Sequence, residues 1–233
     1  MQEDSNVVYI AKIKGTAYEM GEAYGQLFKD YLPQQFANVA TLYPGTIHDL
    51  LLDFGVPAYI VAALTEDMKV TIMNLALDIN WEIAAPYIPQ RYIDEMRGIA
   101  DGSGVDYMTI RRANMLPELT QAHCTVLGVW GKASQDGTVL HLRALDWDAY
   151  APINQYPTVI IYEPTEAGSK SFANIGYLGL IGTLTAMSKI GISAGEKVMI
   201  TDDSRVPPHF YPKGNPEITY VGKPWMMVLR DGV

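Results

Sequence analysis

The sequence predicts an α+β fold, with helices in the first half of the chain and antiparallel strands in the second. Apolar residues recur at helical spacing as far as Leu119, and short β-rich runs begin at Thr125. The dipeptide Asp136-Gly137 separates the first two of these runs and is a strong signal for a β-hairpin. Because helices and strands are segregated rather than alternating, the pattern favours α+β over a doubly wound parallel sheet.

Capping and glycine residues define the first helix. Thr16-Ala17-Tyr18-Glu19 forms a capping box, in which the hydroxyl and the carboxylate satisfy free backbone amides. The helix that it opens reaches about Leu42. Gly21 and Gly25 lie one turn apart on this helix, so we expect another backbone to pack closely against it.

The remaining elements follow from periodicity and from the Gly and Pro residues that separate them. Further helices are expected at residues 47–54, 57–86, 89–100 and 107–119. Strands are expected at residues 125–131, 138–145, 158–162, 171–175, 184–188 and 191–194. Residues 204–216, which contain four prolines, are expected to form a long loop.

The acidic composition and the lack of long apolar runs limit the classes of partner and location. A formal net charge of -9 without any Lys/Arg run argues against a nucleic-acid partner. No apolar run reaches the ~18 to 20 residues of a membrane span. Residues 1–6 lack the basic and apolar regions of a secretory signal, so the protein is either cytoplasmic or secreted with its signal already removed.

Cys124, at the start of the first expected strand, is the only cysteine of the chain. A lone thiol cannot form an intrachain disulfide, so it is either a small buried hydrophobe or a reactive group. Arg143 and Asp146 on the return strand favour the reactive group, although Arg143 alone would also suit a surface ion pair. Asp146 lies three residues after Arg143, so both side chains reach one site only if the strand ends or bulges there.

Four segments of the chain, two of which contain these residues, follow one another in an order that matters for the interpretation. They are Glu95-Met96-Arg97-Gly98-Ile99-Ala100, Cys124-Thr125, Arg143-Ala144-Leu145-Asp146-Trp147 and Gly191-Ile192-Ser193-Ala194-Gly195-Glu196-Lys197. In order and spacing they resemble the motifs of the acid ceramidase and N-acylethanolamine acid amidase family of cysteine N-terminal-nucleophile hydrolases. The related penicillin acyltransferase family shares the opening segment 15–21, and the resemblance covers residues 15 to about 230.

The resemblance implies a fold and a processing event. The fold is the αββα sandwich of antiparallel sheets, preceded here by a helical N-terminal segment. The precursor cleaves itself between His123 and Cys124, so residues 1–123 become a propeptide-derived alpha subunit and residues 124–233 begin the catalytic beta subunit. The two parts form one globular unit. The asparagine motif that supplies part of the family's oxyanion hole has no match here, so the chain is expected to be truncated at its C-terminus.

The resemblance also implies the roles of individual residues. Cys124 is the nucleophile, and its freed α-amine, with a pKa of ~7.7 to 8.0, takes the thiol proton. Arg143 holds the thiolate or the substrate, Asp146 orients the new amine, and Glu196 supports self-cleavage or substrate placement.

The acyl pocket and the cofactor requirement are expectations of the same kind. We expect Trp147, Tyr177 and Leu178, with Leu180 and Ile181, to line the acyl pocket, although apolar residues near a hairpin are more often core. No cofactor or metal is expected, because the pair Asp146 and Asp148 has no histidine at a ligand spacing.

The expected activity is hydrolysis of the amide bond of an N-acylated small molecule with a fatty acyl chain. Two alternatives stay open: an acyltransferase or an amidase acting on acylated amino acids or β-lactams, and a non-catalytic lipid-binding relative. The apolar helix faces of the alpha subunit either contact a membrane peripherally or cover the sheet. A lysosomal or secreted location follows from the resemblance, with a cytoplasmic one as the alternative.

Overall fold

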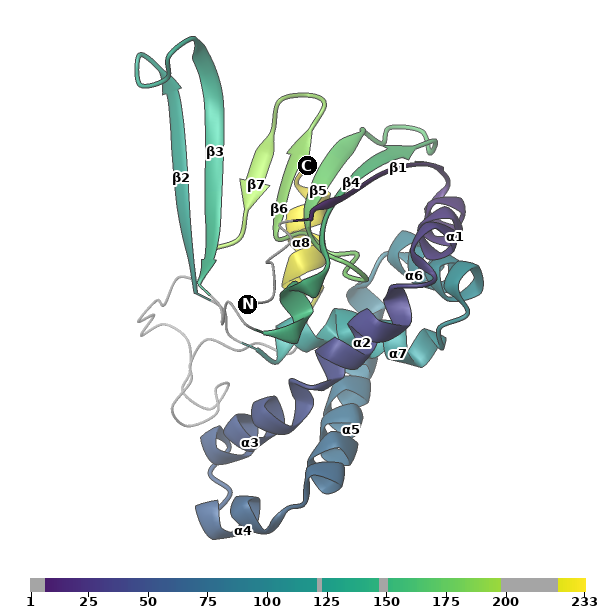
Figure 1. Cartoon of the computed structure of the whole chain (residues 1–233), viewed down its shortest axis with the longest axis vertical. Helices are drawn as coiled ribbons and strands as arrows, with labels where there is room; N and C mark the ends of the chain where they lie inside the picture. The colour runs from purple at the N-terminus through teal and green to yellow at the C-terminus, as the bar shows by residue number, and fades with distance from the viewer. Residues whose placement is uncertain (1–6, 121–122, 147–150, 198–221) are drawn as a thin grey trace.

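The fold is mixed α/β, with a group of helices, a main sheet and a separate two-stranded hairpin (Figure 1). The computed structural model describes residues 7–120, 123–146, 151–197 and 222–233. The helices are α1 (Ala17–Phe28), α2 (Leu32–Ala40), α3 (Tyr43–Asp53), α4 (Ala58–Ala63), α5 (Glu66–Ala84), α6 (Gln90–Ser103), α7 (Tyr107–Met115) and α8 (Trp225–Asp231), with short 3₁₀ turns at Ala85–Tyr87, Leu116–Glu118 and Pro152–Gln155. The strands are β1 (Tyr9–Gly15), β2 (His123–Gly131), β3 (Gly137–Asp146), β4 (Pro157–Pro164), β5 (Phe172–Tyr177), β6 (Thr185–Ser188) and β7 (Ser193–Gly195). The loop expected at residues 204–216 lies outside the described residues.

Strands β1 and β4 to β7 form the main sheet, in the order β1-β4-β5-β6-β7 within the described part of the chain. Neighbouring strands from β4 to β7 are antiparallel, but β1 pairs with β4 in parallel. The expectation of purely antiparallel sheets is therefore wrong for this edge. The sequence analysis missed β1 because this short strand precedes all of the helices and its partner lies far along the chain.

Two expected long helices are each divided in the structure. The helix expected from residue 16 to about Leu42 stops at Phe28, and α2 begins with Pro33 in its first turn, a position that proline tolerates because the amide there needs no partner. The segment expected over 57–86 becomes α4 and α5, since the Thr65 hydroxyl accepts the amide of Met68 and caps α5. The capping box of Thr16 and Glu19 is confirmed.

Glycines bring α1 and α6 into backbone contact, which confirms the close packing expected at Gly21 and Gly25. A Cβ placed on Gly25 would lie 2.5 Å from the carbonyl oxygen of Ile99. On the opposite helix, a Cβ on Gly98 would lie 2.6 Å from the amide nitrogen of Glu22. Because both obstacles are backbone atoms, the two helices can approach this closely only with glycine at the contact.

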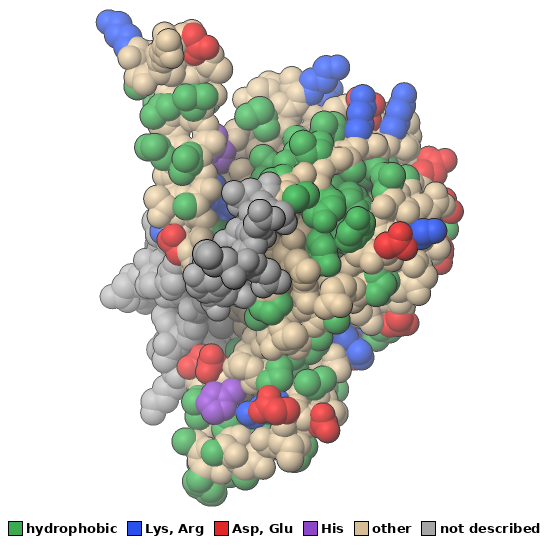
Figure 2. All heavy atoms as spheres, in the orientation of Figure 1, with side chains coloured by type: hydrophobic (Ala, Val, Ile, Leu, Met, Phe, Trp, Pro, Cys, Tyr) green, Lys and Arg blue, Asp and Glu red, His purple; other side chains and the backbone are tan. Residues whose placement is uncertain are grey.

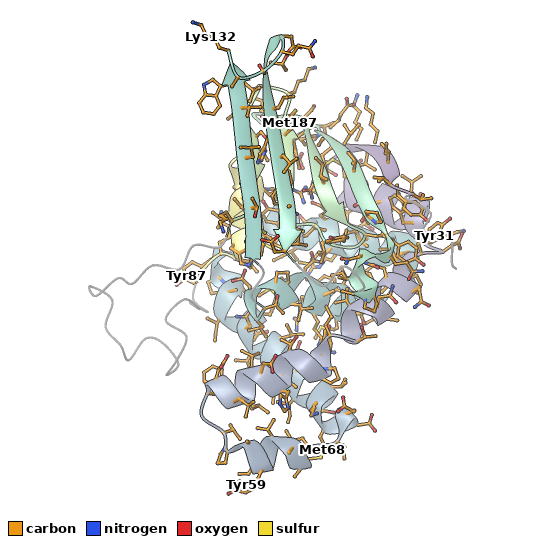
Figure 3. The ribbon with its side chains drawn as sticks, turned by 60° about the vertical axis from the view of Figure 1, so that its left-hand side comes forward. Tyr31, Tyr59, Met68, Tyr87, Lys132 and Met187 are labelled. Carbon is orange, nitrogen blue, oxygen red and sulfur yellow. The ribbon has the colours of Figure 1, made fainter. Side chains whose placement is uncertain are left out.

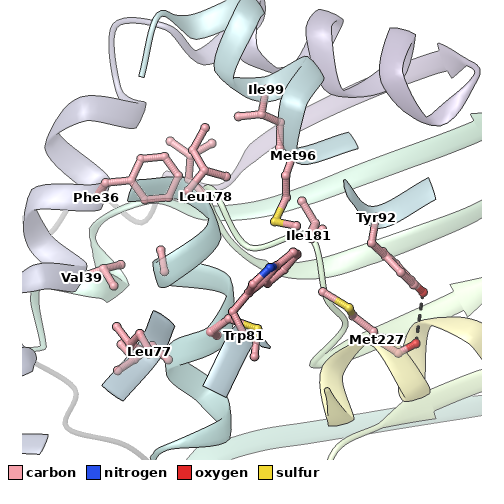
Figure 4. Packing of buried hydrophobic residues seen from close by; sticks show 14 of the residues in the cluster. Phe36, Val39, Leu77, Trp81, Tyr92, Met96, Ile99, Leu178, Ile181 and Met227 are labelled. Carbon is pink, nitrogen blue, oxygen red and sulfur yellow. Dashed lines mark hydrogen bonds between the residues drawn. The ribbon is translucent and has the colours of Figure 1, made fainter. Parts of the chain in front are cut away.

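The hydrophobic core lies between the helices and one face of the main sheet. This inner face carries Ile13, Ile160 and Tyr162, which are at most 3% exposed. The close view in Figure 4 shows side chains from α2, α5 and α6 meeting Leu178 and Ile181 of the segment after β5. The Tyr92 hydroxyl donates to the Met227 carbonyl over 3.1 Å and ties α8 to this core.

Helix α8, which the sequence analysis did not anticipate, is anchored by a buried ion pair. Arg230 bonds both carboxylate oxygens of Glu95, at 3.0 Å and 2.8 Å, and also donates to the Ile181 carbonyl. Its guanidinium lies 4.4 Å from the ring centre of Tyr162. A charged residue on a short helix is thus held in the interior by a complete set of partners.

The outer face of the main sheet is apolar and largely open. Ile10, Ile175 and Met187 on this face are 71%, 43% and 50% exposed. Figure 2 shows hydrophobic side chains gathered over the main sheet. Such a surface on one side of a sheet is typical of a face that another layer covers.

The hairpin of β2 and β3 stands beside the β6–β7 end of the main sheet and projects from the body, with Lys132 at its tip (Figure 3). Its strands are antiparallel, and Gly137 adopts a φ of +79° in the connection, as the Asp-Gly signal predicted. Among the described helices, none is both long and apolar enough to cross a membrane.

Candidate active site at the start of strand β2

Cys124 lies at the start of β2 on the hairpin face that is turned toward the main sheet. It is opposite Leu145 in the β2–β3 ladder and only 1% exposed. Because side chains alternate along a strand, Arg143 on β3 shares this inner face, whereas Thr125 and Asp146 lie on the outer face. The ladder register therefore decides which of the candidate residues reach the sulfur.

Glu196, immediately after β7, places its carboxylate against the sulfur. The Cys124 thiol donates a hydrogen bond to Glu196 Oε2, and the backbone amide of Glu196 donates to the Leu184 carbonyl over 2.8 Å. The residue is 5% exposed, and its second oxygen, Oε1, is buried without a hydrogen-bond partner among the described residues. A buried carboxylate oxygen of this kind is a ready acceptor for one further donor.

Arg143 approaches the sulfur from the hairpin itself. Its Nη1 lies 3.5 Å from Cys124 Sγ, and its Nε donates to the Thr185 hydroxyl over 2.7 Å. Sulfur is a weak acceptor, and a guanidinium at this distance interacts with it mainly through its permanent positive charge. The site thus sets a cation and an anion around one buried thiol.

The environment keeps this thiol protonated. Burial, and after it the Glu196 carboxylate, raise the pKa of Cys124 to about 11, although the Arg143 guanidinium acts in the opposite direction. In the uncleaved chain the group is therefore a neutral thiol at neutral pH. A thiol with this pKa becomes a nucleophile only when a base removes its proton as it attacks.

Asp146 is separated from the sulfur by the regularity of β3. The ladder runs without interruption from Val129 to His123, and its one register shift lies at the far end, between Val129 and Gly131. Of the bulge or strand end expected near Asp146, the described strand shows only the end, because β3 stops at this residue. The pairing stays regular up to that point, so the exposed carboxylate points away from Arg143 and lies 3.5 Å from the Thr125 hydroxyl. His123 is the ladder partner of Asp146.

An apolar pocket of about 60 Å³ lies beside this site. Tyr177 lines it, as expected, together with Leu180 and with Leu145, the ladder partner of Cys124. The remaining lining residues are Leu42, Ala113, Leu116, Pro117, Thr120, Ile153, Leu184, Trp225 and Met226. Burial raises the pKa of the Tyr177 hydroxyl, and Arg143 and Cys124 are its charged neighbours.

Two of the other expected pocket residues are placed differently. Leu178 is 1% exposed and packs in the hydrophobic core, and Ile181 is a core residue as well. Trp147 lies outside the described residues.

Further polar contacts around the site were not anticipated from sequence. Thr185 binds Arg143, and Ser193 on β7 hydrogen-bonds the Nδ1 atom of His141. His141 thus has a hydrogen-bond partner on the main sheet. Strand alternation placed His141 and Arg143 on one face, yet no signal within the sequence shows which later strand packs against that face.

No group of three His, Cys, Asp or Glu side chains gathers as a potential metal site in the part of the chain that the structure describes. The groups in contact with the Cys124 sulfur are the Glu196 carboxylate and the Arg143 guanidinium.

Comparison with known proteins identifies relatives but no family. The chain is 36% identical over 197 residues to protein dcd1A of Dictyostelium discoideum, covering 80% of this chain and 44% of that protein. It is 33% identical over 233 residues to dcd1B of the same organism, covering 98% of this chain and 43% of that protein. An uncharacterized protein of Archaeoglobus fulgidus is 23% identical over 226 residues, covering 86% of this chain and 34% of that protein. The chain spans less than half the length of these relatives, and no protein-family model matches it.

Proposed function

We propose that this chain belongs to a self-processing amidohydrolase of the cysteine N-terminal-nucleophile type, with Cys124 as nucleophile. The observation that carries the proposal is the placement of one buried thiol between the Glu196 carboxylate and the Arg143 guanidinium at the first positions of a strand. A carboxylate can accept the thiol proton, and a guanidinium can hold the resulting negative charge. The resemblance of the surrounding motifs to acid ceramidase and N-acylethanolamine acid amidase supports the same reading.

Self-cleavage uses the thiol while Cys124 is still inside the chain. Glu196 accepts the thiol proton as the sulfur attacks the carbonyl carbon of His123. The His123–Cys124 C–N bond then breaks, the proton moves to the departing amine, and the His123 acyl group is left on the sulfur as a thioester. Water hydrolyses this thioester, which frees the carboxylate of His123 and restores the thiol beside a new α-amine.

Turnover then uses the new N-terminus as the base. The α-amine of Cys124 takes the thiol proton, the sulfur attacks the amide carbonyl of the substrate, and the leaving amine departs with a proton. Water hydrolyses the acyl thioester and releases the acid. An α-amine has a pKa of ~7.7 to 8.0, far below that of lysine, so a useful fraction is neutral near neutral pH.

The neighbouring pocket favours an acyl group as the part of the substrate that binds next to the sulfur. Its lining is apolar apart from Thr120 and the Tyr177 hydroxyl, and its volume of about 60 Å³ suits a short stretch of hydrocarbon rather than a whole chain. We therefore propose an N-acylated amide whose acyl carbons begin in this pocket.

The open face of the main sheet supports the sandwich architecture that the proposal requires. The hairpin places His141 and Arg143 over Thr185 and Ser193, which lie on this outer face. We propose that the hairpin begins a second layer over this face. A second sheet continuing from the hairpin would bury the apolar face that carries Ile175 and complete an αββα arrangement.

Mass spectrometry of the purified protein tests the processing step. Fragments 1–123 and 124–233 are expected after incubation at acid or neutral pH, and Cys124→Ala should abolish both cleavage and amide hydrolysis. Glu196→Gln keeps the shape of the side chain but not the base, so cleavage should slow by ~10²- to 10⁴-fold. Ser134→Ala, in the turn of the same hairpin, is the matched control. An intact Cys124→Ala protein that still hydrolyses N-acyl amides would refute the proposal.

Asp146 sharpens the test because its carboxylate faces away from the sulfur before cleavage. If its role begins only when the new amine exists, Asp146→Asn should leave self-cleavage intact and reduce turnover of N-acyl amides. A loss of self-cleavage in this variant would place Asp146 in the processing step instead.

A second candidate function is a non-catalytic binding protein that takes up an acyl group in the apolar pocket. The observation in its favour is that Cys124 is 1% exposed and has a raised pKa, as inert structural cysteines do. An intact mass at every pH, resistance of the folded thiol to iodoacetamide, and saturable binding of an N-acylethanolamine would favour binding over catalysis.

A further inference from the structure

Arg143 is held at two points, and only one of them is the candidate nucleophile. Its Nη1 faces the Cys124 sulfur at 3.5 Å, whereas its Nε donates to the Thr185 hydroxyl at 2.7 Å. The second contact is much the better hydrogen bond by distance, because nitrogen–oxygen bonds of this kind are usually near ~2.9 Å and sulfur is a weak acceptor. The direction of the guanidinium is thus decided mainly by Thr185.

The strand that carries Thr185 also supports the carboxylate on the other side of the sulfur. Thr185 is the ladder partner of Gly195, the residue directly before Glu196. The Glu196 amide in turn donates to the carbonyl of Leu184, the residue directly before Thr185. The β6–β7 ladder therefore links Thr185, which binds the Arg143 guanidinium, to the backbone of Glu196.

We infer that Thr185 is a positioning residue, whose hydroxyl fixes the guanidinium of Arg143 against the sulfur of Cys124. An arginine side chain loses rotamer entropy when it is held in one arrangement, so an anchoring bond is needed to keep it there. A bond to Nε leaves the terminal nitrogens free for the sulfur or for a negative charge that forms next to it. Only the consequence for catalysis rests on the proposed function. The influence of the Arg143 guanidinium on the ionisation of the Cys124 thiol exists in the uncleaved chain as well.

The chain offers a matched pair of threonines for the test. Thr185→Val removes the hydroxyl at nearly constant shape, and Thr185→Ser keeps it. Thr183, two residues away, is fully buried, and its hydroxyl has no hydrogen-bond partner among the described residues. Thr183→Val therefore removes a hydroxyl from the same segment without touching Arg143.

The readout is the ionisation of a single thiol. In full-length protein labelled with ¹³Cβ-cysteine, Cys124 gives the only cysteine resonance, and its titration is followed in the uncleaved chain. Arg143 lowers the pKa of this thiol, so loosening it in Thr185→Val should move the titration upward by about one unit, a tenfold loss of thiolate at a given pH. Thr185→Ser should restore the wild-type titration, and Thr183→Val should leave it unchanged.

A double-mutant comparison shows whether the effect passes through Arg143. In an Arg143→Gln background, Thr185→Val should shift the titration no further. If Thr185→Val does not fold, as judged by circular dichroism, Thr185→Ala takes its place in each comparison. A wild-type titration in a folded variant without the hydroxyl, or an equal shift in the Arg143→Gln background, would overturn the inference.

Activity separates this inference from the proposed function. If N-acyl amides are hydrolysed, the loss of the Thr185 hydroxyl should lower kcat by about tenfold with little change in KM, because the pocket is untouched. If the wild type shows neither processing nor hydrolysis while the thiol titration still responds to Thr185, the proposed function fails and the positioning role stands.

Discussion

Two glycine contacts in this molecule look alike in the sequence and differ in what opposes them. Between α1 and α6, a Cβ on Gly98 would meet backbone atoms of Tyr18 and Glu22. Between β7 and the hairpin, a Cβ on Gly195 would meet the ring of His141 at 2.8 Å. Backbone in a packed helix cannot yield, whereas the end of a side chain can rotate. The first contact therefore governs stability, and the second adjusts the distance between the hairpin and the main sheet.

The largest expected effect is at the helix contact. Gly98→Ala should lower the free energy of unfolding by about 3 kcal/mol or more, because α1 and α6 must move apart and lose core packing. Denaturant titration followed by circular dichroism measures the change. Gly45→Ala on α3 is the matched control, since a Cβ at Gly45 would have no neighbour within 4 Å. An equal change in the free energy of unfolding of the two variants would contradict the inference that backbone atoms limit the approach of α1 and α6.

The next effect concerns Glu118, a half-buried carboxyl group beside α8. Burial raises the pKa of Glu118 to about 7, and its carboxylate accepts the Trp225 amide over 2.8 Å. A raised pKa means that the folded state binds the proton more tightly, so stability falls as pH rises from about 4.5 to about 7. Glu118→Gln keeps an acceptor without the charge and should be about 1 to 3 kcal/mol more stable than wild type at pH 8.

The same Glu118→Gln protein supplies its own control at low pH. Near pH 4 both side chains are neutral, so its denaturation midpoint should match that of the wild type. An equal gain in stability at both pH values would show that the gain does not come from removing a buried charge. The effect of Glu118 on stability would then be independent of pH.

The smallest expected effect on stability is at the hairpin contact. Gly195→Ala should lower the free energy of unfolding by about 1 kcal/mol or less, because the His141 ring can turn away from the new methyl group. The part of the clash that the ring rotation does not relieve would move the hairpin outward, carry Arg143 away from Cys124 and so raise the pKa of the thiol. ¹³C titration of Cys124 together with thermal unfolding distinguishes this outcome from a loss of about 3 kcal/mol, which would make the two glycine contacts equivalent.

The sequence predicted most accurately where the physical cause is local. The capping box at Thr16 and the Asp-Gly turn of the hairpin each depend on residues within one or two turns. The glycine spacing on α1 indicated a close approach at Gly21, but not that α6 makes it. Helix ends were less predictable, because Pro33 and Thr65 divide segments whose apolar periodicity runs on across the break. Helical periodicity shows which face of a helix is buried, but not where one helix ends and the next begins.

The candidate site was predicted in part. Cys124 and Arg143 were singled out from the sequence itself and Glu196 through the resemblance, and the structure brings these three together. Asp146 was assigned to the same site, but an unbroken ladder turns its carboxylate to the outer face of the hairpin.

What the sequence determined by itself is most of the helices and strands, though not β1 or α8, and the face of β3 on which His141 and Arg143 lie, because periods of 3.6 and 2 residues are properties of the local backbone. Only the tertiary structure decided that β1 pairs with β4 in parallel, and that Thr185, Ser193 and Glu196 meet the inner face of the hairpin. These contacts join segments dozens of residues apart, and their choice depends on which apolar surfaces are buried together rather than on any spacing along the chain.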